Sequence, residues 1–360
     1  MKIGNTALIP QNIAPDNAKS LSIYDGDTKI CTVDISRMRP ANLGIKKYSV
    51  GLLSDTHISP SLTDSITDLT RAISYFSSVA DITCISGDLC VVNENGGLEK
   101  HKEIVNANRG NMEVYAMAGN HEHISNDSVV IITDDDIKQI TNYPLYYTVS
   151  NQPTDETKRN YYSNIIGDDV YIMCGNMGWY ECFDDTSIQW LYETLEVNRN
   201  KRCFLFVHPP IDDSQHCGDA LNVITWDGIG SYKTVFVKLL SHYRNVTWFH
   251  GHTHAMLEMQ NYLQGLYPPL PANYDFMDGV HSVHIPSTSV SRNISSGERV
   301  DVDATSQGYL MDVYENHIVL RGIDFTKIGT AEGELIPIAH YCLDTTLKTV
   351  ESKQASYFGI

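Results

Sequence analysis

The chain has 360 residues, of which 42% are hydrophobic and 19% are charged, the proportions of a globular protein rather than a disordered or membrane-embedded one. Its formal net charge of -18 argues against unaided binding to the phosphate backbone of nucleic acids. No apolar run approaches the roughly 20 residues that span a bilayer, and the first thirty residues lack the basic and apolar regions of a signal peptide.

The cysteines indicate a reducing compartment. Eight are scattered along the chain without a C-x-x-C pair, and Cys84, Cys174 and Cys203 lie inside apolar runs that are typical of strands. This pattern favours buried free thiols over a disulfide framework or a zinc ribbon. We therefore expect a cytoplasmic protein.

Residues 1–46 are predicted to form a β-rich appendage to a main domain over residues 47–360. Two alternating runs, at 21–24 and 30–35, flank an Asp-Gly turn and predict a β-hairpin. An isolated hairpin is marginally stable in water, so we expect it to dock on the main domain or on another subunit. An oligomer could form through this hairpin.

Five short apolar runs, each typical of a buried strand, end in side chains that can bind metals or protons. The runs and the residues that follow them are 48–53 with Asp55 and His57, 82–85 with Asp88, 114–118 with Asn120 and His121, 204–207 with His208, and 246–249 with His252 and His254. Open α/β sheets build their ligand sites beyond the carboxyl ends of strands. Five such ends in one chain predict one shared site.

The segment Gly251-His252-Thr253-His254 is the strongest single indication of metal binding. In an extended backbone, side chains two residues apart lie on the same side, so His252 and His254 are predicted to reach a common centre. Gly251 allows a sharp turn or a close approach, and His250, which precedes it, is predicted to be structural. Taken singly, each of these residues is better explained as a surface residue, a helix cap or a turn, and only their joint order indicates a site.

Helices are predicted between the strands. Their ranges are 62–78, 98–108, 134–140, 186–197 and 232–243. In the first, Ile66, Leu69, Ile73 and Phe76 fall on one helical face. The fourth begins with Thr186-Ser187-Ile188-Gln189, which fits a capping box.

The remaining pattern is mostly strand. A hairpin is predicted at 161–165 and 170–174, further strands at 283–285, 309–314 and 317–324, and a long loop that borders a substrate cleft at 259–280. Strands alternate with helices first and then follow one another with few helices. This order predicts two packed sheets flanked by helices.

The strand-end residues comprise two carboxylates, one amide and four imidazoles, too many ligands for one four-coordinate zinc ion. They suit two divalent ions that share a bridging carboxylate and attract phosphate to an acidic protein. Such a pair lowers the pKa of a bridging water and orients it for in-line attack. His121, beside Asn120, is the candidate general acid or charge stabiliser, and His123 is a weaker one.

In this order the motifs resemble the five blocks of the calcineurin-like metallophosphoesterase superfamily, over residues 48 to about 325. The blocks are Asp55-x-His57, Gly87-Asp88, Gly119-Asn120-His121-Glu122, His208-x-Pro210 and Gly251-His252-x-His254. The resemblance implies an α/β fold, a four-layer αββα sandwich of the metallo-dependent phosphatase type. It also implies a hydrolase for phosphate esters that uses two divalent or mixed-valence ions such as manganese, iron or zinc.

The same resemblance implies a ligand set. One ion would be held by Asp55, His57 and His254, the other by Asn120, His208 and His252, and Asp88 would bridge them. Substrate contacts would come from Asn120, His121 and His123. A fainter similarity, carried by the N-terminal hairpin and by residues 308–324, is to uncharacterised phosphoesterases of bacteria and their prophages.

The chain departs from the specialised branches of the superfamily. Leu89-Cys90-Val91 stands where serine/threonine phosphatases have Asp-Arg-Gly, and Val91 stands where purple acid phosphatases have a metal-bound tyrosine. His208 is a single imidazole where bacterial phosphodiesterases often have two. The arginine of the Asp-Arg-Gly element is absent, and its absence favours a phosphodiesterase. The alternatives are a phosphomonoesterase of the same fold and a non-catalytic metal-binding structural protein of a larger assembly.

Overall fold

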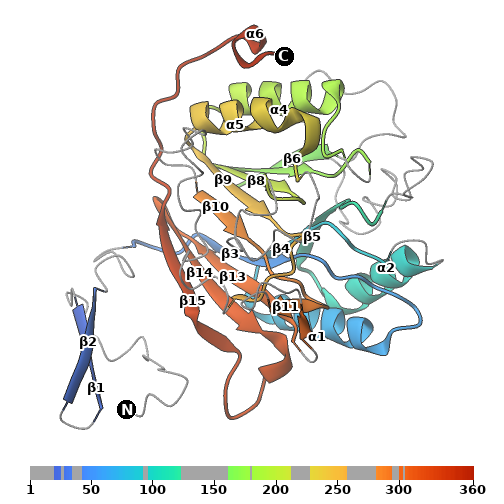
Figure 1. The fold of residues 1–360 in the computed structure, drawn as a ribbon, viewed down its shortest axis with the longest axis vertical. Helices are drawn as coiled ribbons and strands as arrows, with labels where there is room; N and C mark the ends of the chain where they lie inside the picture. The colour runs from blue at the N-terminus through green and yellow to red at the C-terminus, as the bar shows by residue number, and fades with distance from the viewer. Residues whose placement is uncertain are drawn as a thin grey trace.

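A computed structural model describes residues 20–25, 28–34, 43–91, 96–122, 161–178, 181–211, 228–257, 281–293, 300–302 and 305–360. Two sheets pack face to face, and each carries helices on its outer face (Figure 1). The predicted four-layer αββα sandwich is therefore confirmed. The predicted helix at 134–140, the predicted loop at 259–280 and His123 lie outside the described residues.

The first sheet has six strands in the order β15-β14-β13-β3-β4-β5. They are β3 (Tyr48–Leu53), β4 (Ile82–Ser86), β5 (Glu113–Met117), β13 (Gln307–Val313), β14 (His317–Asp324) and β15 (Leu335–Asp344). Strands β3, β4 and β5 are parallel, and the other pairs are antiparallel. Helices α1 (Thr63–Val79) and α2 (Gly97–Asn108) connect the parallel strands and cover the outer face (Figure 1).

The second sheet has five strands in the order β10-β9-β8-β7-β6. They are β6 (Tyr161–Ile166), β7 (Asp169–Cys174), β8 (Cys203–Val207), β9 (Val246–His250) and β10 (His281–His284). All neighbours are parallel except the predicted hairpin β6-β7. Helices α4 (Asp185–Val197) and α5 (Lys233–His242), the latter after the short helix η3 (Gly230–Tyr232), cover its outer face.

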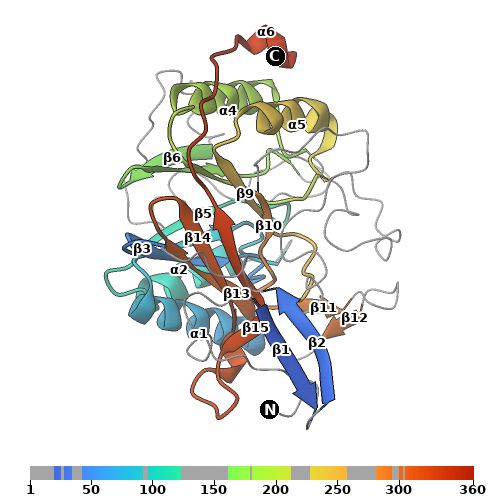
Figure 2. The same cartoon turned by 90° about the vertical axis from the view of Figure 1, so that its left-hand side faces the viewer.

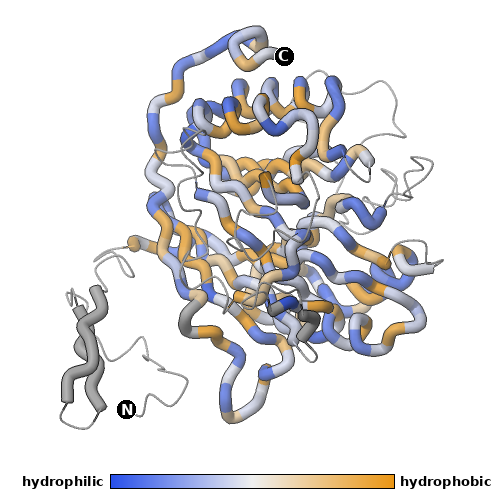
Figure 3. Tube along the Cα trace, viewed as in Figure 1, coloured by the Kyte–Doolittle hydropathy of each residue, from blue (hydrophilic) through white to orange (hydrophobic). Residues whose placement is uncertain are grey.

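Strand β8 shows how the period-two pattern builds both sides of the second sheet. Phe204 and Phe206 pack into the core between the two sheets, whereas Leu205 and Val207 pack beneath α4 and α5. Successive side chains of a strand point to opposite faces, so a strand buried on both faces is apolar throughout. The hydropathy of the chain follows this arrangement, with apolar segments gathered where the layers meet (Figure 3).

The C-terminal segment packs against the helices of the second sheet. After β15 the chain runs past the sheets to α6 (Ala355–Phe358), beside α4 and α5 (Figure 2). Phe358 is fully buried, with its ring 5.6 Å from Tyr192 and 5.7 Å from Tyr243 between centroids. The segment therefore packs on the outer side of these helices, and Phe358 extends their apolar cluster (Figure 1).

Three smaller elements complete the described chain. Strands β1 (Ser20–Asp25) and β2 (Thr28–Asp34) form the predicted antiparallel hairpin, and β11 (Ser291–Asn293) pairs with β12 (Val300–Val302). A short helix, η5 (Phe325–Lys327), follows β14. Within the described residues no helix is both long and apolar enough to cross a membrane.

One local prediction needs correction, and one strand was missed. The capping box of α4 is formed by Asp184 and Ser187, not by a box that starts at Thr186, because the Asp184 carboxylate accepts the Ser187 N–H and the Ser187 hydroxyl accepts the Asp184 N–H. Strand β15 was not predicted, because Pro337 interrupts its pattern. Proline is tolerated there because β15 is an edge strand, where one row of N–H groups has no ladder partner.

A buried ion pair joins the two sheets away from the strand ends that carry the predicted ligands. Arg202 donates two hydrogen bonds to Asp169, at 2.9 and 2.6 Å, and a third to the Tyr314 carbonyl at 2.8 Å. Tyr48 of the first sheet donates to the same carboxylate at 2.6 Å. Arg202 and Asp169 are both buried, so neither charge is solvated by water.

We expect Arg202→Ala to lower the free energy of unfolding by about 3–5 kcal/mol, because Asp169 would remain buried without its cation. Urea denaturation of the metal-free protein measures this loss. The matched control is Arg199→Ala, whose partly exposed pair with Glu196 is expected to contribute less than about 1 kcal/mol. Equal effects of the two substitutions would contradict the proposed role of the pair.

Candidate metal centre

The predicted ligands lie at one edge of the sandwich, beyond the carboxyl ends of the parallel strands. Asp55 and His57 follow β3, Asp88 follows β4 and Asn120 follows β5, all in the first sheet. His208 follows β8, and His252 and His254 follow β9, in the second sheet. The two sheets therefore face each other across the site, as the strand-end rule predicts.

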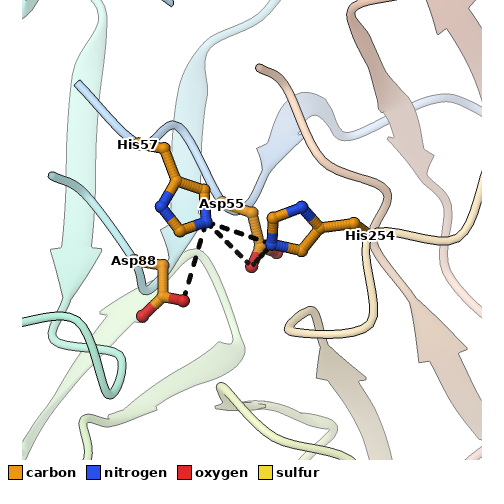
Figure 4. Close-up of side chains that lie close together, drawn as sticks. All are labelled: Asp55, His57, Asp88 and His254. Atoms are coloured by element: carbon orange, nitrogen blue, oxygen red, sulfur yellow. Dashed lines mark hydrogen bonds and ion pairs between the residues drawn. The ribbon is translucent and has the colours of Figure 1, made fainter. Parts of the chain in front are cut away.

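The first group of donors consists of Asp55, His57, Asp88 and His254. All four are buried, and one donor atom from each lies within 4.8 Å of the others. The His254 Nε2 atom is 3.0 Å from both the His57 Nε2 and the Asp55 Oδ1 atoms, and His57 Nε2 is 3.8 Å from Asp88 Oδ2. The side chains point toward one another from three loops (Figure 4). Two carboxylates and two imidazoles at this spacing could hold a divalent ion.

The second group consists of Asp88, His208 and His252, which are also buried and lie within the same 4.8 Å limit. His208 Nε2 is 3.1 Å from Asp88 Oδ2, and the rings of His208 and His252 meet edge to face with centroids 5.2 Å apart. Asp88 belongs to both groups. A carboxylate shared by two donor sets is the arrangement that a bridging ligand requires.

Asn120 supplies a buried amide in the loop that packs against Asp88 through Gly119 and the His121 N–H. Its side chain is only 2% exposed, and neither its oxygen nor its nitrogen makes a hydrogen bond within the described part of the chain. Gly119 allows this approach, because a Cβ atom at that position would overlap the Asp88 carboxylate. A buried amide without a partner costs free energy, so its oxygen fits a metal ligand.

The backbone is strained at the donors. Among the described non-glycine residues, those with positive φ are Asp55 at 51°, His57 at 40°, Asp88 at 49°, His252 at 70° and His254 at 59°. Such conformations cost of order 1–3 kcal/mol each and persist where the surroundings impose them. Their restriction to candidate ligands indicates that the loops are shaped for binding rather than for stability.

The predicted extended backbone at the two histidines after Gly251 is wrong. Both residues adopt left-handed conformations, and their side chains reach the two neighbouring donor groups rather than one centre. Gly251 is required because a Cβ atom there would overlap the Ser54 hydroxyl. The loop after β9 thus lies directly against the loop after β3.

Hydrogen bonds orient the two carboxylates. The Ser54 hydroxyl and the His252 N–H donate to Asp55 Oδ2 at 2.6 and 2.9 Å, which leaves Oδ1 toward the first group. The His121 N–H donates to Asp88 Oδ1 at 2.9 Å, which leaves Oδ2 toward His208. Outer contacts of this kind fix the geometry of metal ligands.

The electrostatics favour ionised Asp55 and Asp88 and neutral His57 and His252, whereas the two carboxylates, against the effect of burial, raise the pKa of His208 to about 10. Burial opposes the ionisation of Asp88, but neighbouring His208 and His121 outweigh it and hold its pKa well below the ordinary value. Burial, supported by the charge of His208, lowers the pKa of His252 to about 3. Ionised carboxylate and neutral imidazole are the forms that bind metals.

Glu122, for which the sequence pattern predicts no role, joins two of the ligand loops. Its carboxylate accepts the N–H groups of Leu89 at 2.8 Å and Cys90 at 3.0 Å, after Asp88, and that of Gly119 at 2.7 Å, before Asn120. Burial raises the pKa of Glu122 to about 7. Its position in the family motif Gly119-Asn120-His121-Glu122 is the sequence signal that could have indicated this role.

The other histidines near the site occupy different positions. The His121 Nε2 atom is 3.8 Å from Asp88 Oδ2, and its side chain is 21% exposed, more than those of His57 and Asp88. His250 is buried in β9 with its ring against Trp248 and His284, in line with the structural role predicted for it. His284 contacts the Thr253 hydroxyl at 2.8 Å.

The chain is similar to a known family in sequence and to solved structures in fold. Residues 48–256, more than half of the chain, match the model of the calcineurin-like phosphoesterase family. A purple acid phosphatase from yellow lupin (Lupinus luteus) seeds has 12% sequence identity and a TM-score of 0.53, and the match covers 85% of this chain and 57% of that one. GAP50 of Plasmodium has 12% identity and a TM-score of 0.49, with coverage of 87% and 93%. Curated proteins gave no significant match to the sequence.

The chain therefore belongs to the calcineurin-like phosphoesterase family, a class of metal-dependent hydrolases of phosphate esters. The family match ends at residue 256, short of the predicted limit near residue 325, so strands β10, β13, β14 and β15 lie outside it. The solved structures support the fold alone at this level of identity.

Proposed function

We propose that the chain is a dinuclear metallophosphoesterase that prefers phosphodiesters. One ion is held by Asp55, His57 and His254, a second by Asn120, His208 and His252, and Asp88 bridges them. The observation that carries this proposal is the membership of Asp88 in both buried donor groups. When bound, the two ions supply an activated water for in-line attack and neutralise charge on the phosphate. The metals we expect are manganese, iron, zinc or similar ions.

His121 is the candidate catalytic residue among the protein side chains. It lies beside the bridging carboxylate, outside both donor groups, and is more exposed than the candidate ligands of the first group. From this position its ring can donate a proton or a hydrogen bond to the leaving oxygen of the ester.

The preference for diesters is inferred from the loop after Asp88. Leu89 and Cys90 stand where a cationic clamp for a phosphomonoester would be expected, and both side chains are buried among apolar residues. A monoester dianion carries more charge than a diester monoanion and gains more from a guanidinium partner. Without that partner at this loop, the monoester loses more binding energy than the diester.

The metal-loaded protein is expected to cleave bis(p-nitrophenyl) phosphate with a kcat/KM about tenfold or more above that for p-nitrophenyl phosphate, since one charge-assisted contact is worth about 1.5–3 kcal/mol. Both substrates release the same chromophore, so one assay compares them directly. A tenfold preference for the monoester would overturn the diesterase assignment and leave the metallohydrolase class intact.

A further inference from the structure

A serine-rich turn that follows β10 lies against the candidate ligands of the first ion. We call residues 285–292 the Ser287 turn. It lies beyond the family match, which ends at residue 256. Its sequence, Ile285-Pro286-Ser287-Thr288-Ser289, repeats the pattern of a strand followed by polar residues, although none of these side chains is a typical metal ligand.

The Ser287 hydroxyl links this turn to Asp55. Ser287 is fully buried, and its hydroxyl donates to the Asp55 carbonyl at 2.9 Å while it accepts the N–H groups of Ser289 at 3.2 Å and Val290 at 2.9 Å. A hydroxyl has one proton, so the two backbone donors direct that proton to Asp55. The Thr288 N–H adds a hydrogen bond to the Ser54 carbonyl at 3.0 Å.

The same turn holds His254. The Val290 carbonyl accepts from His254 Nδ1 at 2.7 Å, and the Arg292 N–H donates to the His254 carbonyl at 2.8 Å. A carbonyl can only accept, so Nδ1 carries the proton and Nε2 keeps its lone pair for a metal. Ser287 sets the position of Val290 through the N–H contact, and thus acts on both Asp55 and His254.

The turn is also anchored to the first sheet. The Ser306 hydroxyl donates to the Thr288 carbonyl at 2.6 Å, and the Gln307 N–H donates to the Ser287 carbonyl at 3.3 Å. Both residues belong to the segment that leads into β13 of the first sheet. The turn therefore connects the second sheet, through β10, with the loop after β3.

We infer that Ser287 is a positioning residue for the first ion, and that it orients Asp55 and His254 without contacting the metal itself. This inference rests on the proposed dinuclear site. It predicts that loss of Ser287 lowers the affinity for the first ion more than that for the second, because the turn contacts ligands assigned to the first ion. A residue that only stabilised the fold would weaken both ions alike.

The test measures metal affinity in full-length variants by calorimetric titration of the chelator-treated protein with Mn²⁺. His208→Ala is used as a background in which the first ion is retained, and His57→Ala as one in which the second is retained. Ser287→Ala is expected to weaken the remaining ion by about 10–100-fold in the first background and by less than about threefold in the second. Ser287→Thr, which keeps the hydroxyl, is expected to restore most of the lost affinity.

Two controls separate this effect from a general loss of stability. Ser65→Ala removes a buried hydroxyl that donates to the Leu62 carbonyl at 3.1 Å in the first turn of α1, outside both donor groups, and should leave both ions unchanged. Ser306→Ala removes the hydrogen bond to the Thr288 carbonyl and should lower the affinity for the first ion by about threefold or more. If Ser287→Ala does not fold, this variant provides the test.

The outcomes are distinguishable. Wild-type protein that binds fewer than two ions would contradict the proposed function itself. Wild-type protein that binds two ions, with Ser287→Ala weakening both backgrounds equally or neither, would overturn only the positioning role. If Ser287→Ala does not fold, an unchanged Mn²⁺ affinity in Ser306→Ala would also overturn the positioning role.

Discussion

Asp88→Asn is expected to reduce phosphate-ester turnover by about 1000-fold or more and to leave fewer than two ions bound per chain. Asp88 is the residue common to both donor groups, and its Oδ2 atom faces His208 at 3.1 Å and His57 at 3.8 Å. An amide of the same shape has no negative charge, so its oxygen holds two cations much more weakly than the carboxylate does. A loss of this size corresponds to about 4 kcal/mol of transition-state stabilisation.

Elemental analysis and turnover of the same preparation measure both parts of this prediction. The matched control is Asp312→Asn, which alters a buried carboxylate of the same sheet that pairs with Ser49 and Arg321 instead of the site. The control should keep two ions and turnover within about threefold of wild type. Full activity in Asp88→Asn would contradict the bridging role of Asp88. Metal-loaded wild-type protein that cleaves neither monoesters nor diesters would favour the non-catalytic, structural alternative.

His121→Ala is expected to reduce turnover by roughly 100-fold or more while two ions stay bound. His121 lies outside both donor groups, so its removal should leave the metal ligands in place. Its Nε2 atom is 3.8 Å from Asp88, close enough to the proposed ions to act on the leaving group of a bound ester. The loss should grow when p-nitrophenol is replaced by a poorer, alkyl leaving group, because an alkoxide needs a proton more than a nitrophenolate does.

The leaving-group dependence separates catalysis from positioning. His317→Ala removes a half-buried imidazole from the start of β14 and serves as the control, with no expected change in turnover for either leaving group. Loss of one ion in His121→Ala would show that this histidine is a ligand. An equal loss for good and poor leaving groups would contradict the general-acid role.

Much of the fold could be predicted from sequence, because buried strands carry a local signal. The predicted bounds of β3 and β14 agree with the structure at every residue, and six of the seven candidate ligands lie together in the two donor groups at the strand ends. Strand β15 escaped prediction because Pro337 hides a strand whose place at the sheet edge depends on distant residues.

The details of the site depend on tertiary contacts that local patterns do not encode. The left-handed backbone at His252 and His254 arises where the loop after β9 packs on Ser54 and Asp55, almost two hundred residues away in sequence. Ser287 carries no metal-binding signal, and its role follows only from the packing of its turn against Asp55. Positive φ at five ligands contradicts local propensity, as is expected where a site is strained for function.

Anomalous diffraction from crystals of the manganese-loaded protein tests the central claim most directly. The proposed site predicts two peaks about 3.5 to 4 Å apart on either side of the Asp88 carboxylate. One peak should lie beside Asp55, His57 and His254, and the other beside Asn120, His208 and His252. A single peak, or none between these loops after loading with manganese, iron or zinc, would contradict a dinuclear centre in this chain.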